Sequence, residues 1–403
     1  MDAVEHQLHT AEELMQLEKD YLFQNYARYP VVLSRGKGCY LYDLEGKRYL
    51  DLISGIGVNA LGYSHPRITK VIQKQAALLL HTSNLYYHEF QGPLAKRLSE
   101  ASGLQRTFFC NSGTEAMEAA LKMARAHGRK ISPDKFEIVA LDHSFHGRTF
   151  GALSITGQPK YREPFEPLLP GVRFAPRRDV FALEQLVNEN TCAIVIEIIQ
   201  GEAGVYPVCQ RMLQKARALA TKYDALLIFD EIQCGVGRPG TYFSYQLFDP
   251  IIMPDACVLA KPISCGLPLG ALLANDKAAS AIGPGMHGST YGGGPLATHV
   301  ALEFFDILDE LLPSINSVGS FFRMKLTELA HRHKFIKEVR GAGLMIGVEL
   351  AIPGKQMVLD GIEHGVLFNC THDTVLRFLP PYILTEQDVE RAVASLDKIF
   401  EKY

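Results

Sequence analysis

The middle of the chain alternates strand-like apolar runs with amphipathic helical stretches, and this alternation constrains the fold more than any single residue. The strand-like runs lie near 136–141, 192–199, 225–229 and 256–260. The helical stretches before and between them include 113–129, 180–188 and 209–223. Such alternation is typical of β-α-β units, in which helices cover a largely parallel sheet. The sequence therefore predicts an α/β fold with a mostly parallel sheet between helices.

The chain has 403 residues, of which 47% are apolar, and this is enough for two domains. After a long helical pattern from about Pro295 to Leu312, the character of the chain changes. Further helices are expected near 315–333 and 385–402, and strands near 344–350 and 375–379, with short strands around 40–42 and 47–49. We predict an N-terminal segment (1–52) that packs with a smaller C-terminal α/β domain (301–403), and a large ligand-binding domain between them (53–300).

The overall charge and the cysteines limit the class of protein. Lys and Arg (41) nearly balance Asp and Glu (44), which indicates neither a nucleic-acid partner nor a membrane partner. The eight cysteines show no C-x-x-C spacing, and a chain of this size needs no disulfides. The N-terminus lacks the basic and apolar regions of a signal peptide, and no apolar run reaches about 18 residues. We expect a cytoplasmic protein with reduced thiols.

Lys261 directly follows the strand-like run 256–260 and is itself followed by Pro262. A lysine between a buried strand and a rigid turn is held in place and partly desolvated. Desolvation lowers the pKa of an amine and frees its lone pair for carbonyl chemistry. Most lysines at strand ends are solvated surface charges, however, so the position alone does not establish a site.

Asp230 and Gln233 follow the run 225–229, at a place where open α/β sheets bind ligands beyond the carboxyl ends of their strands. An acidic residue that merely marks a turn is the alternative. An apolar run ending in Asp-Glu also resembles the magnesium-binding strand of nucleotide triphosphatases. That class needs a G-x-x-x-x-G-K-[ST] loop, and no Gly-Lys pair here is followed by Ser or Thr, which excludes it.

Ser112, Gly113 and Thr114 open the helical stretch 113–129. Ser112 with Glu115 three positions later predicts a capping box, so an ordinary helix start is one interpretation. The free N–H groups and partial positive charge of a helix start also favour a phosphate, and glycine lets the backbone approach closely. Phosphate binding is the functional alternative.

The loop after the run 136–141 contains His143, Phe145, His146 and Arg148. An aromatic face for stacking and a guanidinium for a carboxylate suggest a ligand platform. The alternative is a polar surface loop with one ring packed inward. The two histidines have no Cys or His neighbours at metal-binding spacing, so we expect no metal site.

Together these stretches resemble the class III pyridoxal-phosphate-dependent aminotransferases over nearly the whole chain, which implies their fold type I. The matching motifs are 50–66, 111–116, 145–149, 200–205, 229–231, 259–261, 287–290, 340–345 and 376–381. Within this class, Gly-Ile-Gly-Val-Asn-Ala-Leu-Gly (55–62) and Phe-His-Gly-Arg-Thr (145–149) are most similar to the acetylornithine aminotransferases.

The resemblance implies that Lys261 binds pyridoxal 5′-phosphate (PLP) covalently and then moves a proton as general base and acid. It implies that Asp230 pairs with the ring nitrogen of the cofactor. The remaining cofactor contacts that it implies are Phe145 stacked on the ring, Gln233 near the ring's 3′-oxygen, Ser112, Gly113 and Thr114 at the phosphate, and Thr290 reaching the phosphate from a neighbouring subunit. The last contact would make a homodimer the catalytic unit.

Substrate contacts are implied in the same way. Arg148 and Arg377 are expected to bind carboxylates through two parallel hydrogen bonds, with Ser289 as a further contact. Glu197 matches a glutamate that neutralises an active-site arginine when no carboxylate occupies it.

The implied reaction is a ping-pong exchange of the terminal amino group of N2-acetyl-L-ornithine with 2-oxoglutarate, as in arginine biosynthesis. Ornithine, succinylornithine, N-succinyl-diaminopimelate and 4-aminobutyrate remain alternative donors. Tyr63, Ile198 and Gly294 depart from the residues common in the family, and this leaves the donor open. An aminomutase and a non-enzymatic binding protein are further alternatives.

Overall fold

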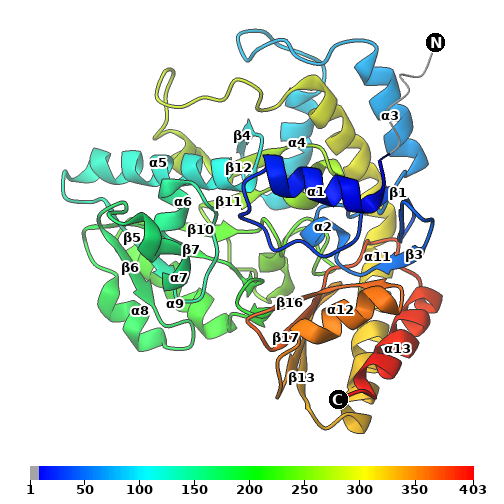
Figure 1. The fold of residues 1–403 in the computed structure, drawn as a ribbon. Helices are drawn as coiled ribbons and strands as arrows, with labels where there is room; N and C mark the ends of the chain where they lie inside the picture. Colours follow the sequence, from blue (N-terminus) through cyan, green and yellow to red (C-terminus); the bar gives the residue numbers. More distant parts are fainter. Residues whose placement is uncertain (1–8) are drawn as a thin grey trace.

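The computed structural model describes residues 9–403, so residues 1–8 of the predicted N-terminal segment lie outside the described residues. A seven-stranded sheet runs through the larger part of the molecule, in the left half of Figure 1. In spatial order its strands are β4 (Arg106–Cys110), β12 (Gly270–Ala274), β11 (Ala256–Leu259), β10 (Leu226–Asp230), β7 (Thr191–Ile196), β5 (Glu137–Leu141) and β6 (Val172–Ala175). Only β12 runs against its neighbours, which confirms the mostly parallel sheet.

Both faces of this sheet are buried because side chains alternate along each strand. In β10, Leu226 and Ile228 face one hydrophobic core, and Leu227 and Phe229 face the other. The first core is covered by α5 (Gly113–Ile131), whose apolar face was expected from its periodicity. The second core includes side chains from α8 (Val180–Leu186) and α9 (Gln210–Lys222).

The C-terminal part of the chain forms a second α/β unit, drawn in orange and red in Figure 1. Its antiparallel sheet has the order β13 (Ile336–Ala342), β14 (Met345–Leu350), β17 (Val375–Phe378) and β16 (Asn369–Thr371). The helices α12 (Lys355–Glu363) and α13 (Glu386–Phe400) accompany it.

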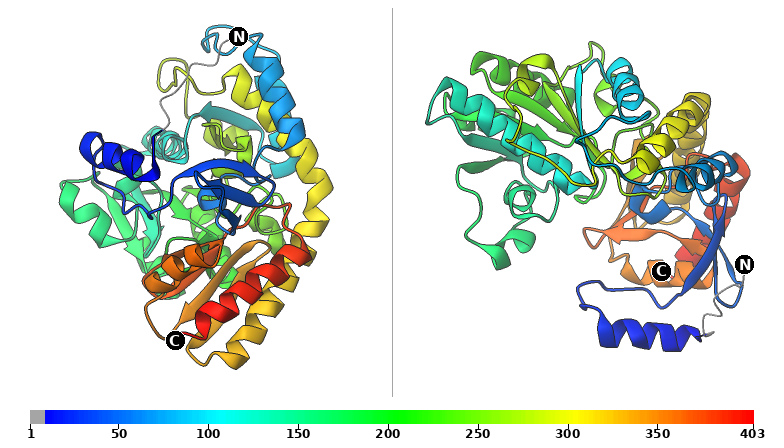
Figure 2. Two further views of the ribbon diagram at one scale, coloured as in Figure 1. Left: turned by 45° about the vertical axis from the view of Figure 1, so that its right-hand side comes forward. Right: turned by 90° about the horizontal axis from the view of Figure 1, so that it is seen from above.

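The N-terminal segment contributes a small sheet of β1 (Leu33–Lys37), β2 (Tyr40–Asp43) and β3 (Arg48–Asp51). Strand β3 pairs in parallel with β15 (Val366–Leu367), so this segment is joined to the C-terminal unit. The exact domain boundaries at 52 and 300 stay a prediction. Helix α1 (Ala11–Tyr21) buries none of its residues and stands apart from the body of the chain in the right-hand view of Figure 2.

One helix differs from the prediction. The patterns at 295–312 and 315–333 were expected to form separate helices, whereas α11 runs without interruption from Pro295 to Arg332, through Pro313. A proline inside a helix removes one backbone hydrogen bond. Both halves of α11 bury large apolar side chains, among them Phe304 in the first and Phe322 in the second, and this packing outweighs the lost bond.

The remaining elements are short or connect these layers. They are α2 (Ser54–Gly57), α3 (Pro66–Ala76), α4 (Gln91–Ser102), α6 (Phe150–Ser154), α7 (Pro159–Arg162), α10 (Asp276–Ala279), β8 (Ile199–Gln200), β9 (Tyr206–Pro207) and 3-10 helices at Glu163–Phe165, Ser244–Leu247 and Lys261–Ser264. Among the described helices, none combines the length and the apolar composition that a membrane span requires.

Candidate active site

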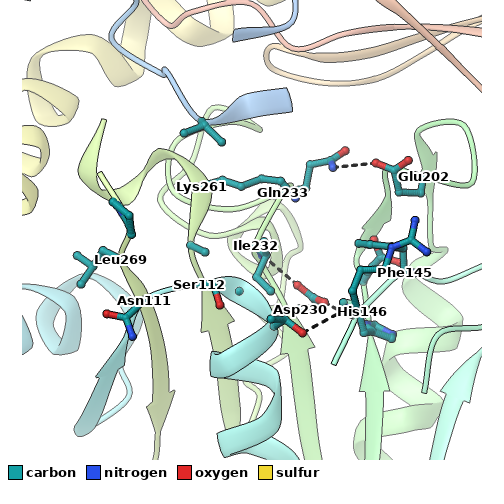
Figure 3. A pocket seen from close by; sticks show the side chains of 18 of the residues that line it. Asn111, Ser112, Phe145, His146, Glu202, Asp230, Ile232, Gln233, Lys261 and Leu269 are labelled. Atoms are coloured by element: carbon teal, nitrogen blue, oxygen red, sulfur yellow. Dashed lines mark hydrogen bonds and ion pairs between the residues drawn. The ribbon is translucent and has the colours of Figure 1, made fainter. Parts of the chain in front are cut away.

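A cavity of about 400 Å³ lies beyond the carboxyl ends of the parallel strands (Figure 3). The structure brings nine of the twelve predicted site residues to its walls: Ser112, Gly113, Thr114, Phe145, Arg148, Glu197, Asp230, Gln233 and Lys261. They come from five segments spread between positions 112 and 261, and they converge because β4, β5, β7, β10 and β11 all end at the same edge of the sheet. Arg377, Ser289 and Thr290 do not line this cavity.

Lys261 follows β11 and opens the 3-10 helix Lys261–Ser264 with a φ of +47°, a conformation that is costly for a residue with a Cβ. Burial lowers the pKa of its amine, although the carboxylates of Glu202 and Asp230 act in the opposite direction. The predicted desolvation is therefore present, and the amine gives up its proton more readily than a surface lysine does.

Asp230 ends β10 and is almost completely buried. Its Oδ2 accepts a hydrogen bond of 2.7 Å from His146 Nδ1, and its Oδ1 accepts one of 3.1 Å from the backbone N–H of Ile232. Burial disfavours the charged imidazole, but the hydrogen bond and the charge of Asp230 outweigh it and raise the pKa of His146. The sequence pattern gave no sign that His146 is the partner of Asp230.

Glu197 is placed differently from its predicted role. Its carboxylate accepts a hydrogen bond of 2.9 Å from the backbone N–H of Phe145, and no ion pair joins it to an arginine in the part of the chain that the structure describes. Burial raises the pKa of Glu197 to about 8. In this structure the buried Glu197 carboxyl group therefore contacts the backbone of Phe145 and not an arginine.

The arginine pair belongs instead to Glu202, which the sequence pattern did not single out. Arg377 lies on β17 and is 1% exposed, and its Nη1 donates to Glu202 Oε1 at 2.6 Å and to Gln233 Oε1 at 3.0 Å. Burial works against ionisation of Glu202, but Arg377 and then Lys261 hold the pKa of this carboxyl below its usual value. Glu202 and Gln233 line the cavity, so Arg377 reaches the site through them.

The start of α5 forms another wall. Ser112 Oγ accepts a hydrogen bond of 3.3 Å from the N–H of Glu115, as predicted. The Glu115 carboxylate accepts a hydrogen bond of 2.6 Å from the N–H of Asn111 and not from that of Ser112, so only half of the capping box is formed. The backbone N–H groups of Gly113 and Thr114 have no acceptor among the described residues. A Cβ on Gly113 would lie 2.7 Å from Ile232 Cδ1, so only glycine allows this close packing.

Arg148 lies exposed at the rim, with its guanidinium 4.2 Å from the centre of the Tyr161 ring and 5.3 Å from that of Phe145. His143, from the same loop, does not line the cavity, and its ring lies 5.9 Å from that of His372.

Ser289 and Thr290 lie in the loop before α11. Ser289 Oγ accepts a 3.2 Å hydrogen bond from the side chain of Asn111, a residue of the cavity wall, so it is one residue removed from the cavity. Thr290 is exposed and borders a small surface pocket with residues 81–84. Its contact with a neighbouring subunit stays a prediction.

Known proteins match this arrangement over almost the full chain. The family model described as "Aminotransferase class-III" matches residues 21–400. The chain belongs to the class III aminotransferase family. It is 45% identical to the acetylornithine aminotransferase of Aquifex aeolicus, over 94% of this chain and 99% of the relative. It is 44% identical to that of Methanocaldococcus jannaschii, over 96% and 98%.

Solved structures agree. The ornithine aminotransferase of Toxoplasma gondii superimposes with a TM-score of 0.93 at 33% identity, covering 98% of this chain and 96% of that one. The acetylornithine aminotransferase of Elizabethkingia anophelis gives a TM-score of 0.88 at 32% identity, covering 98% and 99%. The chain is therefore a PLP-dependent transaminase with the fold type I architecture. The cavity fits this cofactor, because two unpaired N–H groups, a buried carboxylate and an amine of lowered pKa face one space.

Proposed function

We propose that the chain transfers the terminal amino group of N2-acetyl-L-ornithine to 2-oxoglutarate in a ping-pong reaction. The single observation that carries this proposal is the Glu202–Arg377 pair at 2.6 Å beside Lys261, which gives one site two charge states. The names of relatives at 41–45% identity support the choice of donor. Ornithine is the second candidate donor, because solved structures of ornithine aminotransferases superimpose with TM-scores up to 0.93.

When bound, PLP supplies an electron-withdrawing ring that takes up the charge left on the substrate carbon. Lys261 would hold the cofactor, and Asp230, itself oriented by His146, would face the ring nitrogen. The unpaired N–H groups of Gly113 and Thr114, at the positive end of α5, suit the phosphate. Ser112, Phe145 and Gln233 complete the proposed set, with Phe145 against the ring face and Gln233 near the 3′-oxygen.

Lys261 also acts as the proton carrier in this proposal. An amine whose pKa is lowered by burial accepts a proton at Nζ from the substrate carbon and returns it without a large energetic cost.

In this proposal Arg148, Arg377 and Glu202 determine which substrate binds in each half-reaction. The amine donor presents its distal carboxylate to Arg148 and nothing to Arg377, so Glu202 neutralises Arg377. In the second half-reaction, the two carboxylates of 2-oxoglutarate bind Arg148 and Arg377, and Glu202 gives up its pair. Ser289 is a further proposed contact. In this proposal Glu202 takes the role that the family resemblance implied for Glu197.

We also propose a homodimer with shared active sites. The loops 78–87 and 286–291 expose large apolar side chains: Leu78, Leu79, Leu80, Leu85, Tyr86, Tyr87, Met286 and Tyr291. Two contacts show that these loops are adjacent: the rings of His81 and Tyr291 lie 5.3 Å apart, and the Asn84 side chain donates to the Ser289 carbonyl. Apolar patches of this kind are typical of protein–protein interfaces. A subunit docked here would bring Thr290 to its partner's phosphate site.

Sedimentation tests the dimer. The protein should sediment as a dimer, and Tyr87→Asp with Leu85→Asp should give monomers without activity. An unaltered protein that sediments as an active monomer would contradict the shared site. The eight free cysteines are compatible with the cytoplasmic location that we propose, where the reaction would serve arginine biosynthesis.

A panel of amine donors with 2-oxoglutarate tests the substrate. The kcat/KM for N2-acetyl-L-ornithine should exceed that for ornithine, succinylornithine, N-succinyl-diaminopimelate and 4-aminobutyrate by about tenfold or more. A higher value for ornithine would favour the second candidate. Turnover of one substrate without any oxo acid would indicate an aminomutase.

A further inference from the structure

Arg340, on β13, belongs to a motif that the family shares but that contributes nothing to the cavity wall. It is 7% exposed, and each of its guanidinium nitrogens has an acceptor. Nε donates to the carbonyls of Gly204 (3.0 Å) and Val205 (3.2 Å), and Nη2 donates to that of Gly204 (2.7 Å). Nη1 donates to the carboxylates of Glu338 (2.9 Å) and Glu349 (2.5 Å). The side chain thus spans from its own sheet to a turn beside the cavity.

That turn, residues 201–205, connects β8 with β9 and is strained. Val205 has a φ of +57°, which is a costly conformation for a β-branched residue, and Gly204 has a φ of +106°. Strained backbone of this kind persists only where its surroundings hold it. The side-chain hydrogen bonds from Arg340 fall on the carbonyls of Gly204 and of the strained Val205, so Arg340 helps to hold the turn, together with the N–H groups of these two residues, which donate to the Gly201 carbonyl.

The turn carries Glu202. The Glu202 carboxylate meets Arg377 at 2.6 Å, and the Glu202 carbonyl accepts a hydrogen bond of 2.8 Å from Thr371 Oγ1. A change in the turn moves this carboxylate relative to Arg377, because the two lie on different parts of the chain, whereas Lys261 and Asp230 keep their places at the ends of the central strands.

We propose that Arg340 is a positioning residue for substrate selection: by holding the 201–205 turn, it keeps Glu202 on Arg377. This inference rests on the proposed function, in which that pair favours the amine donor and competes with a dicarboxylate. Loss of the Arg340 contacts therefore weakens the donor half-reaction and strengthens dicarboxylate binding. General destabilisation would weaken both.

The test uses the cofactor-loaded protein and glutarate, a dicarboxylate without the reactive carbonyl, whose Kd is measured by calorimetry. The variants are Glu202→Gln, Arg340→Lys and the double variant. A lysine keeps the charge but cannot reproduce the planar fork of donors. Arg177→Lys is the matched control. Arg177 lies over the ring of Tyr206, the residue after the turn, at 4.0 Å, but its side chain donates to Gln200 and not to the turn.

Glu202→Gln should bind glutarate about tenfold more tightly, and Arg340→Lys about threefold more tightly, while the single-turnover rate with N2-acetyl-L-ornithine falls in both. The double variant should match Glu202→Gln alone, because Arg340 acts through Glu202. The control should change neither quantity. Should Arg340→Lys not fold, Glu349→Gln, which removes a charged partner of Arg340, should shift both quantities in the same directions.

Two results separate the failures. If Glu202→Gln leaves glutarate binding unchanged, the proposed charge switch falls, and with it the proposed function. Suppose instead that Glu202→Gln behaves as expected. If Arg340→Lys then weakens glutarate binding, or if the effects of the two substitutions add in the double variant, the role assigned to Arg340 is overturned. The proposed function stands in either case.

Discussion

The two sides of the cavity are built in different ways. The side on which we propose that the cofactor binds contains Lys261, which follows β11, and Asp230, which ends the adjacent strand β10 and is held by a buried histidine. The substrate side uses Glu202 from a strained turn and Arg377 from β17, in the second sheet. The residues of the first side lie at one edge of a single sheet. The second side brings together two parts of the chain, and in the proposed reaction it is the side whose charge changes between substrates.

The two sides therefore differ in which part of the proposed reaction they determine. In the proposed reaction, residues at the edge of the seven-stranded sheet carry the chemistry that both half-reactions share, and the Glu202–Arg377 pair carries the discrimination between substrates. Substitutions on the cofactor side should therefore affect both half-reactions alike. Substitutions that break the Glu202–Arg377 pair should affect the two half-reactions in opposite directions.

The largest effect is expected at Lys261. Lys261→Ala removes the cofactor's covalent anchor and the proton carrier, so kcat should fall by roughly 1,000-fold or more in both half-reactions. The visible absorbance of the loaded protein should disappear as well. Lys277→Ala, at an exposed lysine paired with Asp224, is the control and should keep both. Retained activity in Lys261→Ala would contradict the roles proposed for Lys261 as cofactor anchor and proton carrier.

Asp230→Asn should slow both half-reactions by about 100-fold, since it removes a preorganised charge from the site. It also leaves His146 without its carboxylate in a buried place, so the free energy of unfolding should fall by about 3 kcal/mol. Single-turnover rates and urea titrations measure the two effects. Asp255→Asn, which weakens a partly buried pair with Arg217 outside the cavity, should cost stability and leave the rates unchanged. A selective effect of Asp230→Asn on one substrate would contradict the division between the two sides.

Arg148→Ala should raise the KM of both substrates about tenfold, or about 1.4 kcal/mol, because each presents a distal carboxylate to this exposed arginine. The value of kcat should change little. Arg178→Ala, at another exposed arginine outside the cavity wall, is the control. An unchanged KM would locate the distal carboxylate elsewhere.

The smallest effect concerns stability and pH. The pKa of Glu197 is raised to about 8 in the folded chain, so between about pH 4.5 and 8 the folded state binds more protons than the unfolded state. Its contribution to stability is therefore fully present below pH 4.5 and is lost as the pH rises through 8. Glu197→Gln should reduce the stability difference between pH 5 and pH 8 by about 1 kcal/mol or more.

Urea titrations at the two pH values measure that difference, with Glu184→Gln, at an exposed glutamate paired with Lys215, as the control. A pH dependence in Glu197→Gln that equals that of the unaltered protein would show that this carboxyl ionises as readily in the fold as outside it.

Much of the cofactor side could be predicted from the sequence because its residues stand at strand ends, which local patterns reveal. Local patterns indicate Lys261, Asp230 and Ser112–Thr114, all of which line the cavity. The partner of Arg377 could not be found, because Glu202 lies 175 positions away and no spacing encodes such a contact. His146 and Asp230 are likewise 84 positions apart. The continuation of α11 through Pro313 was missed because local propensity opposes what tertiary packing favours.

The most direct test of the central claim, that one site serves two substrates in turn, is a single-substrate product assay on the loaded protein. N2-acetyl-L-ornithine alone should yield one equivalent of N-acetyl-L-glutamate 5-semialdehyde per subunit and then stop, until 2-oxoglutarate is added and glutamate appears. Product that forms only when both substrates are present, or that continues to form without 2-oxoglutarate, would contradict the account.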